Sequence, residues 1–296
     1  MISIIITTFK EPLTIKKAID SFISQNIKES FELLVVAPDK ETEDLVKGYK
    51  DIRIRFIKDN GLGKASALNL AFKKAKGNIL ILSDGDVYVS NNSVNEILNP
   101  FKDKDIGCVS GRPVSISDRN NIVGFWSHFL VDIGAHEISR KKRFLNNQFL
   151  ECSGYLFAFR SGVIGQIPTD VAEDTIIPYY FYKKGYKIGY TENAIVYVKY
   201  PTNLKEFIKQ KVRTAKAHET LNKYAPDIPR VKSFRNEFME GLKNLRVITS
   251  YPQNLKEFFW LLLLFPTRLY IWLKVYFQHS LKKDRYKDAW ERININ

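Results

Sequence analysis

Two carboxylates stand together where an apolar segment of the chain ends. Asp84 and Asp86, separated by Gly85, directly follow the aliphatic run from Ile79 to Leu82. Such a short run, bounded by glycine and charge, is typical of a buried strand in a parallel sheet. Ligands of open α/β sheets bind at the carboxyl ends of these strands, and residues i and i+2 of an extended chain point to the same side. The pair therefore predicts a site for Mg²⁺ or Mn²⁺ next to a diphosphate, with a solvated turn as the alternative.

A second acidic pair, Glu173 and Asp174, precedes a helix-like stretch that runs from Ile176 to Lys184. Repulsion between neighbouring carboxylates raises a pKa, which suits a general base that works near neutral pH. Carboxylates at a helix N-terminus also complement the helix dipole. The two roles are compatible, because the helix would carry the pair at its start.

Glycine and basic residues accompany these acids. Gly61 and Gly63 allow the backbone to approach a ligand closely. Lys64 can place its ammonium group near a phosphate, or it can be a surface lysine on the first turn of a helix. Gln210 and Arg213 are spaced i, i+3, so they share one face of a predicted helix.

Strand-like and helix-like segments alternate through the first third of the chain. Ile15, Ala18, Ile19 and Phe22 follow a helical period, and Pro12 is tolerated in the first turn of that helix. The alternation predicts an α/β fold with a mostly parallel sheet and right-handed crossovers. We expect strands at residues 2–7, 33–36, 52–57, 77–83, 106–114, 155–159 and 188–197, and a mobile loop or amphipathic surface helix at 139–148.

The last third of the chain is basic and contains an aromatic, apolar stretch. The net charge is +14, and from residue 199 onward 20 Lys and Arg stand against 9 Asp and Glu. Residues 258–277 are long enough to span a bilayer. Pro266, Arg268 and Lys274 interrupt them, and a charge in mid-span costs roughly 2.5–3.5 kcal/mol. Aromatic residues beside lysines favour a helix that lies in the interface of an anionic membrane. The alternatives are packed helices of a soluble protein and a basic tail that binds nucleic acid.

Cysteine usage and the N-terminus indicate a compartment. Cys108 and Cys152 are the only cysteines and belong to no CxxC or Cys/His cluster, which argues against a disulfide framework and a zinc site. The first residues form a strand pattern with no basic region or cleavage site, so we expect no signal peptide. With the membrane-interface helix, these features predict a peripheral or monotopic protein on the cytoplasmic face of the membrane.

Five segments in a fixed order carry a resemblance to a known family. They are Ile5-Ile6-Thr7-Thr8-Phe9-Lys10-Glu11, the turn from Gly61 to Asn69, Asp84-Gly85-Asp86, Glu173-Asp174 and Gln210-Lys211-Val212-Arg213. From Ser3 to Glu219 the chain resembles family 2 glycosyltransferases, which are inverting enzymes of GT-A fold that use nucleotide sugars. The resemblance implies a Rossmann-like nucleotide-binding half and an acceptor half within residues 1–220, followed by a helical, membrane-surface extension at 221–296.

The resemblance also assigns roles to residues. Asp84 and Asp86 would hold Mn²⁺ or Mg²⁺, a Lewis acid for the departing diphosphate. Asp174, with Glu173 beside it, would be the base that deprotonates an acceptor hydroxyl. The donor nucleotide would be bound by Thr8, Glu11, Asp39, Gly63, Lys64, Asp84, Gln210 and Arg213.

Two departures from the family pattern bear on specificity. Thr214 stands where the family motif Gln-x-x-Arg-Trp has tryptophan, which favours a single transfer over processive polymerisation. Ala37-Pro38-Asp39-Lys40 stands where the family usually has Asp-Asp-Gly-Ser. A carboxylate that recognises the nucleobase would therefore be missing or moved to Asp39.

The expected function is transfer of a sugar from a nucleotide-diphosphate sugar, with UDP as the expected nucleotide, to a hydroxyl of a lipid-linked or glycan acceptor at the membrane. A polyprenyl-phosphate sugar synthase is the alternative within this class, because its anionic acceptor needs no strong base. A sugar-phosphate nucleotidyltransferase would need a glycine-rich basic loop after the first strand, which is not present there. A nucleic-acid-binding protein would leave both acidic pairs unexplained, so no nucleic acid is expected.

Overall fold

The fold is built around one mixed, eight-stranded sheet with the strand order β3-β2-β1-β4-β7-β6-β8-β5. The computed structural model describes residues 1–228 and 231–280. Strands β1 to β4 are mutually parallel, β7 runs antiparallel to β4 and β6, β6 and β8 are parallel, and β5 is antiparallel to β8. The strands are β1 (Ile2–Thr7), β2 (Phe31–Ala37), β3 (Ile54–Lys58), β4 (Ile79–Asp84), β5 (Tyr88–Val89), β6 (Ile106–Ser115), β7 (Leu156–Arg160) and β8 (Lys187–Val198).

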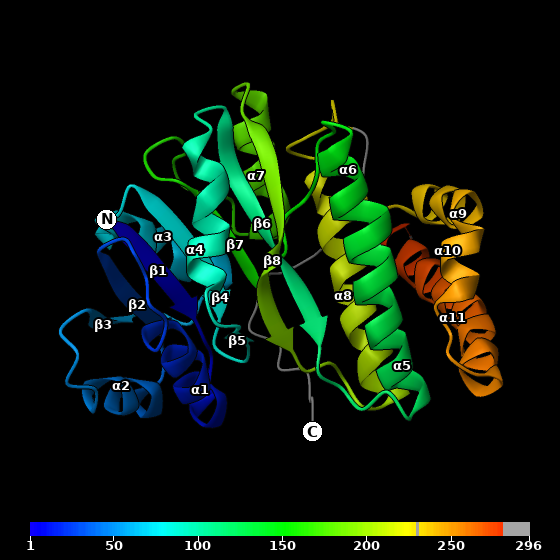
Figure 1. Ribbon diagram of the computed structural model, residues 1–296, viewed down its shortest axis with the longest axis horizontal. Coiled ribbons are helices and arrows are strands. Elements are labelled where there is room, and N and C mark those ends of the chain that lie inside the picture. Colours follow the sequence, from blue (N-terminus) through cyan, green and yellow to red (C-terminus); the bar gives the residue numbers. More distant parts are fainter. Residues whose placement is uncertain (229–230, 281–296) are drawn as a thin grey trace.

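Helices cover both faces of the sheet and extend beyond one edge of it (Figure 1). They are α1 (Pro12–Ile23), α2 (Lys40–Lys47), α3 (Lys64–Lys74), α4 (Ser93–Leu98), η1 (Asn99–Lys102), α5 (Ile122–Phe129), η2 (Leu130–Lys141), α6 (Lys142–Leu145), α7 (Glu173–Lys183), α8 (Leu204–Leu221), α9 (Phe234–Lys243), α10 (Leu245–Ser250) and α11 (Leu255–Ser280). The predicted α/β fold class is confirmed, with the fully parallel order limited to the first four strands.

Alternation along β1 explains the two main layers. Ile4 and Ile6 belong to the hydrophobic cluster under α1, whereas Ile5 belongs to the cluster that includes residues of α3 and α7. Successive strand residues point to opposite faces, so a strand that is apolar at every position must be covered on both. The carboxyl ends of β1 to β4 are thereby held at one edge of a rigid sheet.

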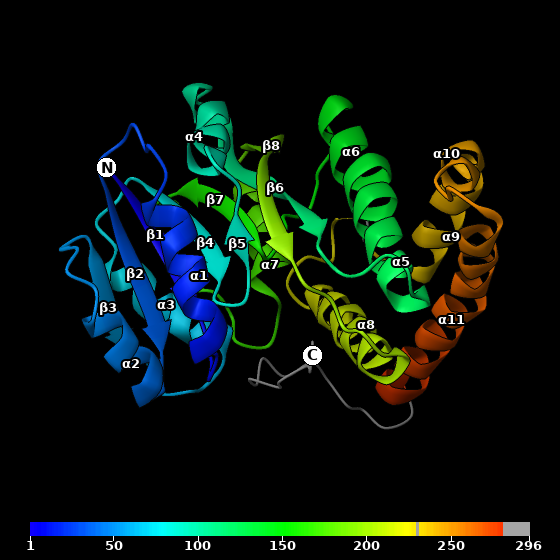
Figure 2. The same cartoon turned by 60° about the horizontal axis from the view of Figure 1, so that its bottom comes forward.

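A third hydrophobic cluster joins α5, α8 and α11, which lie beside the sheet (Figure 2). Phe125, Phe207 and Leu261 are buried there, one from each helix. The Trp126 indole N–H also donates to the Trp260 carbonyl at 2.7 Å. The apolar C-terminal helix thus packs one side against the main body of the protein.

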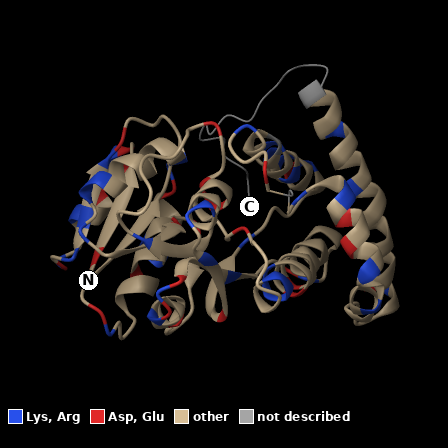
Figure 3. Cartoon of the chain, turned by 90° about the horizontal axis from the view of Figure 1, so that it is seen from above, with Lys and Arg blue, Asp and Glu red and all other residues tan. Residues whose placement is uncertain are grey.

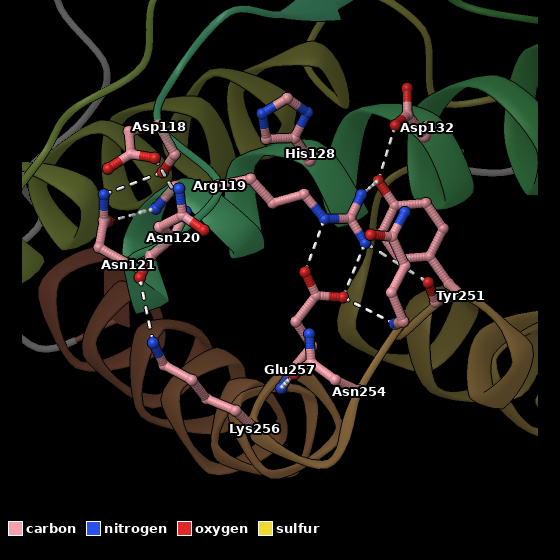
Figure 4. A network of polar contacts seen from close by, with 12 residues as sticks. Asp118, Arg119, Asn120, Asn121, His128, Asp132, Tyr251, Asn254, Lys256 and Glu257 are labelled. Carbon is pink, nitrogen blue, oxygen red and sulfur yellow. Dashed lines mark hydrogen bonds and ion pairs between the residues drawn. The ribbon is translucent and has the colours of Figure 1, made fainter.

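A polar network fastens the start of α11 to the loop before α5 (Figure 4). The Arg119 guanidinium donates to both carboxylate oxygens of Glu257 at 2.7 and 2.8 Å, and to the Tyr251 hydroxyl at 3.1 Å. Tyr251 in turn donates to Asp132 in η2 at 2.7 Å. Bidentate pairs of this kind fix orientation as well as contributing energy.

The segment at residues 139–148 is a surface helix over 139–145, one of its two expected forms, and Arg140 is the one buried residue in it. Its first part continues η2, a π-helix, and is followed by the short helix α6. Arg140 is buried, and its guanidinium donates to the carbonyls of Glu151 and Cys152 at 3.1 Å each. The burial of Arg140 was not predicted, because the basic sequence gives no sign of these carbonyl partners.

Candidate active site

The end of β4 delivers the first acidic pair next to the end of β1. The Gly85 N–H donates to the Thr7 carbonyl at 3.0 Å, and the Thr7 hydroxyl lies 3.5 Å from the Asp84 carboxylate. A Cβ at position 85 would lie 2.5 Å from the Thr8 side chain, so only glycine fits between the two carboxylates. Thr8 is held by a hydrogen bond to Glu11 at 3.1 Å. The predicted donor residues Thr8 and Glu11 therefore border the predicted metal pair.

Lys64 connects the two acidic pairs that the sequence analysis identified. Its ammonium lies 2.6 Å from Asp84 and 2.6 Å from Glu173, and 3.4 Å from the Gly154 carbonyl. The lysine enters from the first turn of α3, directly after Gly63, whose φ of +109° is accessible mainly to glycine. Tertiary structure thus brings residues 64, 84 and 173 to one point.

Asp174 lies beside this ion pair, at the start of α7. A Cβ on Gly154 would be 3.3 Å from a carboxylate oxygen of Glu173 and 3.4 Å from one of Asp174, so both acids face the same glycine. The Asp174 carbonyl accepts from the Cys152 N–H at 3.0 Å, which ties the helix start to the irregular segment that precedes Gly154. Glu173 is engaged by Lys64, which leaves Asp174 as the carboxylate to receive a proton.

Burial raises the pKa values of the acids at this site. Burial raises the pKa of Asp84 to about 7, against the favourable charge of Lys64, and the charges of Asp86 and Glu173 add to the increase. Burial also raises the pKa of Asp86, and burial with the neighbouring Glu173 charge raises that of Asp174. Carboxylates whose pKa is raised in this way bind protons and cations readily at neutral pH.

The carboxylate pair fits a divalent cation by its chemistry. Asp84 ends β4 and Asp86 lies in the turn that follows, and both offer hard oxygen donors, the ligand type that Mg²⁺ and Mn²⁺ prefer. Within the described ranges, no group of three or more His, Cys, Asp or Glu side chains could enclose a metal ion. Two carboxylates complete a coordination shell only with further oxygens, which a bound diphosphate and water can supply.

Several residues near the acids were not identified from the sequence. The Glu151 carboxylate is buried, 3.3 Å from His218 on α8 and 3.3 Å from Lys232. Burial alone would raise the pKa of Glu151, but the charges of His218 and Lys232 lower it to about 2. Tyr155 packs edge-on to Tyr200, with ring centroids 6.0 Å apart. Their burial raises both tyrosine pKa values. The segment Glu151-Cys152-Ser153-Gly154-Tyr155 has no metal-ligand or nucleophile spacing, so no sequence pattern pointed to it.

Gln210 and Arg213 lie on α8, whose start is capped by the side chain of Asn203. The side-chain carbonyl of Gln210 is buried without a hydrogen-bond partner among the described residues. His218 on the same helix lies 3.3 Å from Glu151, so α8 lies on the side of the site that holds Asp174. Gln210 and Arg213 stay predictions as donor ligands.

Both oxygens of the Asp39 carboxylate already accept hydrogen bonds from the protein. One carboxylate oxygen accepts from the Thr42 N–H at 2.9 Å and from the Thr42 hydroxyl at 2.7 Å, which caps α2. The other oxygen accepts from the Lys10 N–H at 3.1 Å. These hydrogen bonds outweigh partial burial and lower the pKa of Asp39.

A parallel-sheet edge with a carboxylate pair, a bridging lysine and a second acidic pair defines a nucleotide-sugar transferase site of GT-A type. The family model of glycosyl transferase family 2 matches residues 3–167, more than half of the chain. The chain belongs to that family. The match includes Lys64, Asp84 and Asp86 and ends before Glu173.

Curated relatives share low identity over most of the chain. An N-acetylglucosaminyltransferase of Bradyrhizobium diazoefficiens is 23% identical over 238 residues, which are 73% of this chain and 48% of that protein. A poly-beta-1,6-N-acetyl-D-glucosamine synthase of Staphylococcus aureus is 24% identical over 232 residues, 74% of this chain and 55% of that protein. The chain therefore spans about half the length of these relatives.

Solved structures share the fold. The mannosyltransferase PcManGT from Pyrobaculum calidifontis, in complex with GDP-Man and Mn²⁺, has a TM-score of 0.66 at 16% identity and covers 95% of this chain and 87% of its own. TarS 1-349 of S. aureus, in complex with UDP-GlcNAc, has a TM-score of 0.53 at 14% identity and covers 100% and 97%. The GT-A fold expected from the sequence is confirmed.

Proposed function

We propose that this chain is an inverting glycosyltransferase that moves a sugar from a nucleotide-diphosphate sugar, with UDP as the expected nucleotide, to a hydroxyl of a lipid-linked acceptor. The observation that carries the proposal is the bridge from Asp84 through Lys64 to Glu173. It joins one residue of the candidate metal pair to the neighbour of the candidate base Asp174, although the three residues are far apart in the sequence. Family membership and the donors named for the similar structures support the same class.

The donor half of the reaction depends on charge. A bound Mn²⁺ or Mg²⁺ would be held by Asp84 and Asp86 and would stabilise the leaving nucleoside diphosphate as a Lewis acid. Lys64 supplies a fixed positive charge at the same place, because its ammonium is already oriented by two carboxylates. Thr8 and Glu11, which are hydrogen-bonded to each other, border the site at the end of β1.

The acceptor half depends on Asp174. An acceptor hydroxyl attacks C1 of the sugar from the face opposite the phosphate, its proton passes to Asp174, and the C1–O bond to the diphosphate breaks. The raised pKa of Asp174 suits this base, since burial and the neighbouring Glu173 disfavour its charged form. An anionic phosphate acceptor would not need that base, so these acids favour a hydroxyl over a polyprenyl phosphate.

The outer side of α11 supports a membrane-presented acceptor. Among the described residues, one helix is long and apolar enough to cross a membrane, over Leu255–Gln278, and 22% of its apolar window is buried in the protein. Its 26 residues include four charged ones, Lys256, Glu257, Arg268 and Lys274 (Figure 3 colours the charged residues along the chain). Large apolar side chains are exposed along it: Phe258, Phe259, Leu262, Leu263, Phe265, Leu269, Tyr270, Leu273, Tyr276 and Phe277.

Arg268, one of the two charges that interrupt this stretch, is engaged by the protein. Arg268 forms two hydrogen bonds of 2.6 Å to Glu237 of α9, and the Trp272 indole donates to the same carboxylate at 2.9 Å. The exposed face therefore keeps its apolar character beside the basic residues of α9 to α11. We place this face in the interface of an anionic, cytoplasmic membrane surface, where each nearby Lys or Arg contributes about 1 kcal/mol.

A donor and acceptor screen tests the function. The full chain is incubated with a panel of UDP- and GDP-sugars, with Mn²⁺, Mg²⁺ or chelator, and with or without membrane lipid extract. We expect metal-dependent release of one nucleoside diphosphate, increased by lipid extract, with a product of inverted anomeric configuration. Absence of release from every donor in the presence of metal would refute the proposal.

A further inference from the structure

One lysine of α8 is withdrawn from solvent without an acid beside it. Lys211 is half-buried, with its ammonium 5.7 Å from the ring centroid of Tyr200 and 5.5 Å from that of Phe207. Among the described residues, no Asp or Glu lies within ion-pair distance of this ammonium. Aromatic rings attract a cation, but they replace only part of the hydration that a lysine loses on burial. Lys211 is therefore a cation without its own anion.

The charged neighbours of Lys211 add to this excess. Burial and the charges of Arg268 and Lys232 lower the pKa of Lys211 to about 7, while the charge of Glu237 opposes them. Glu237 already accepts two hydrogen bonds from Arg268, and Lys232 lies 3.3 Å from Glu151. We call Lys211, Lys232 and Arg268 the basic cluster. It holds more positive charge than its two acids neutralise, so it favours the binding of an anion.

The basic cluster lies next to the candidate base. Glu151, the partner of Lys232, directly precedes Cys152, whose N–H donates to the Asp174 carbonyl at 3.0 Å. The charge of Lys232 accordingly acts on both Asp174 and Lys211. An anion at this cluster would therefore lie on the acceptor side of the site, near the carboxylate that receives the proton.

The other end of the basic cluster belongs to the helix with the exposed apolar side. Arg268 is part of α11, which packs against α8 in the third hydrophobic cluster. In the opposite direction, Tyr200 connects Lys211 to Tyr155, because the two tyrosine rings pack 6.0 Å apart, and Tyr155 directly follows Gly154. An acceptor whose lipid chain covers α11 and whose hydroxyl reaches the base would bring its linking phosphate to this cluster.

We propose that the basic cluster binds the phosphate that joins the lipid to the acceptor sugar, with Lys211 as the lysine that gains an anionic partner. The inference rests on the proposed function and narrows its acceptor to a saccharide linked to lipid through a phosphate or diphosphate. A neutral glycolipid would leave Lys211 unpaired. The phosphate here is a binding group and undergoes no reaction, since the hydroxyl that attacks C1 is the one beside Asp174.

The test uses farnesyl diphosphate, a short lipid diphosphate, and farnesol, which lacks the phosphates. Calorimetry on the full chain is done with a chelator, which excludes binding through a metal at Asp84 and Asp86. We expect saturable binding of farnesyl diphosphate, at least about 10-fold tighter than that of farnesol. Lys211→Met should weaken it about 10- to 100-fold. Lys205→Met, the same change at an exposed lysine of α8, should bind like the wild type.

Stability separates a binding role of Lys211 from a structural one. Removing an unpaired charge from aromatic surroundings should leave the melting temperature of Lys211→Met unchanged or raise it. The dissociation constants of UDP and GDP with Mn²⁺ should stay within about twofold of the wild type. A lower melting temperature with unchanged binding of farnesyl diphosphate would show that Lys211 is structural and would overturn the inference.

Three further outcomes would contradict the inference. If Lys211→Met weakens UDP or GDP rather than farnesyl diphosphate, the lysine holds the donor diphosphate. If it instead reduces flotation with phosphatidylglycerol liposomes and leaves farnesyl diphosphate binding unchanged, the cluster binds a membrane phospholipid. If the wild type binds a nucleoside diphosphate with Mn²⁺ but does not prefer farnesyl diphosphate to farnesol, the inference fails alone. If it binds no nucleoside diphosphate, the proposed function itself fails.

Discussion

The centre between β4 and α7 holds charge that is largely withdrawn from solvent, whereas the outer side of α11 exposes large apolar side chains. Asp84, Asp86 and Asp174 stay in an environment that raises their pKa values, with Lys64 as the cation that bridges the first pair to Glu173. Phe259 and Tyr276 are 60% and 64% exposed. Each arrangement costs free energy in an isolated soluble protein.

The two regions differ in what would relieve that cost. A divalent cation and a diphosphate would compensate the buried carboxylates, and a membrane interface would cover the apolar face. Substitutions at the centre should therefore change chemistry and nucleotide binding. Substitutions on the outer side of α11 should change membrane binding and leave nucleotide binding intact.

The largest effect is expected for Asp86→Ala. Removing one of two metal carboxylates should reduce transfer below detection and abolish Mn²⁺-dependent binding of the nucleoside diphosphate, measured by calorimetry. The melting temperature should change little, because the residue follows the strand end rather than forming part of the apolar core. Glu41→Ala, an exposed acid on α2, is the matched control. Wild-type nucleotide binding by Asp86→Ala would show that the metal assignment is wrong.

Asp174→Asn should slow the chemical step and leave donor binding unchanged. The amide is nearly isosteric but takes no proton, so turnover should fall at least about 10²-fold while the dissociation constant of the donor stays within about twofold. Glu173→Gln is the comparison, since it removes the anion that Lys64 contacts and should weaken donor binding as well. Near-normal turnover of Asp174→Asn would favour a polyprenyl-phosphate acceptor.

Nucleotide affinity in the presence of Mn²⁺ should depend on pH. The pKa of Asp84 is raised to about 7 by burial, and metal binding requires its ionised form. Affinity should therefore be full above this pKa and fall by up to about tenfold per pH unit below it. Calorimetry from pH 5.5 to 8.5 measures the profile. A flat profile across this range would mean that Asp84 is already fully ionised in the absence of metal.

Paired substitutions on α11 separate its two sides. Leu261→Ala, in the cluster shared with α5 and α8, should lower the free energy of unfolding by about 2–5 kcal/mol. Phe259→Ser with Phe277→Ser should change it by less than about 1 kcal/mol and should reduce flotation with anionic liposomes. Salt should weaken the flotation of the wild type without abolishing it. If the exposed pair alters stability rather than flotation, the outer side of α11 is a protein interface.

Removing α11 would be a less informative experiment. Its buried side chains complete the third hydrophobic cluster, and Glu257 engages Arg119 in the network of Figure 4. A chain shortened before residue 253 would expose that cluster. Loss of transfer could then follow from unfolding rather than from loss of membrane contact.

The amino-acid sequence by itself determined the first half of the fold and the chemical residues. The run from Ile79 to Asp84 is apolar enough to be a strand wherever it lies, and the period of Ile15, Ala18, Ile19 and Phe22 specifies a helix. Asp84, Asp86, Glu173 and Asp174 were found because acidic pairs beside a predicted strand end and a predicted helix start are local patterns. These features depend on neighbours within a few residues.

Tertiary structure decided which side chains meet and which are left without a partner. The contact of Lys64 with Asp84 and Glu173, the burial of Arg140 under two carbonyls and the pair of Glu151 with His218 join residues from different segments. Asp39 and Asp59 each follow a strand, yet Asp39 accepts hydrogen bonds on both oxygens whereas one buried oxygen of Asp59 has no partner among the described residues. Hydrogen-bond satisfaction and burial depend on where the whole chain passes, so no local pattern encodes them.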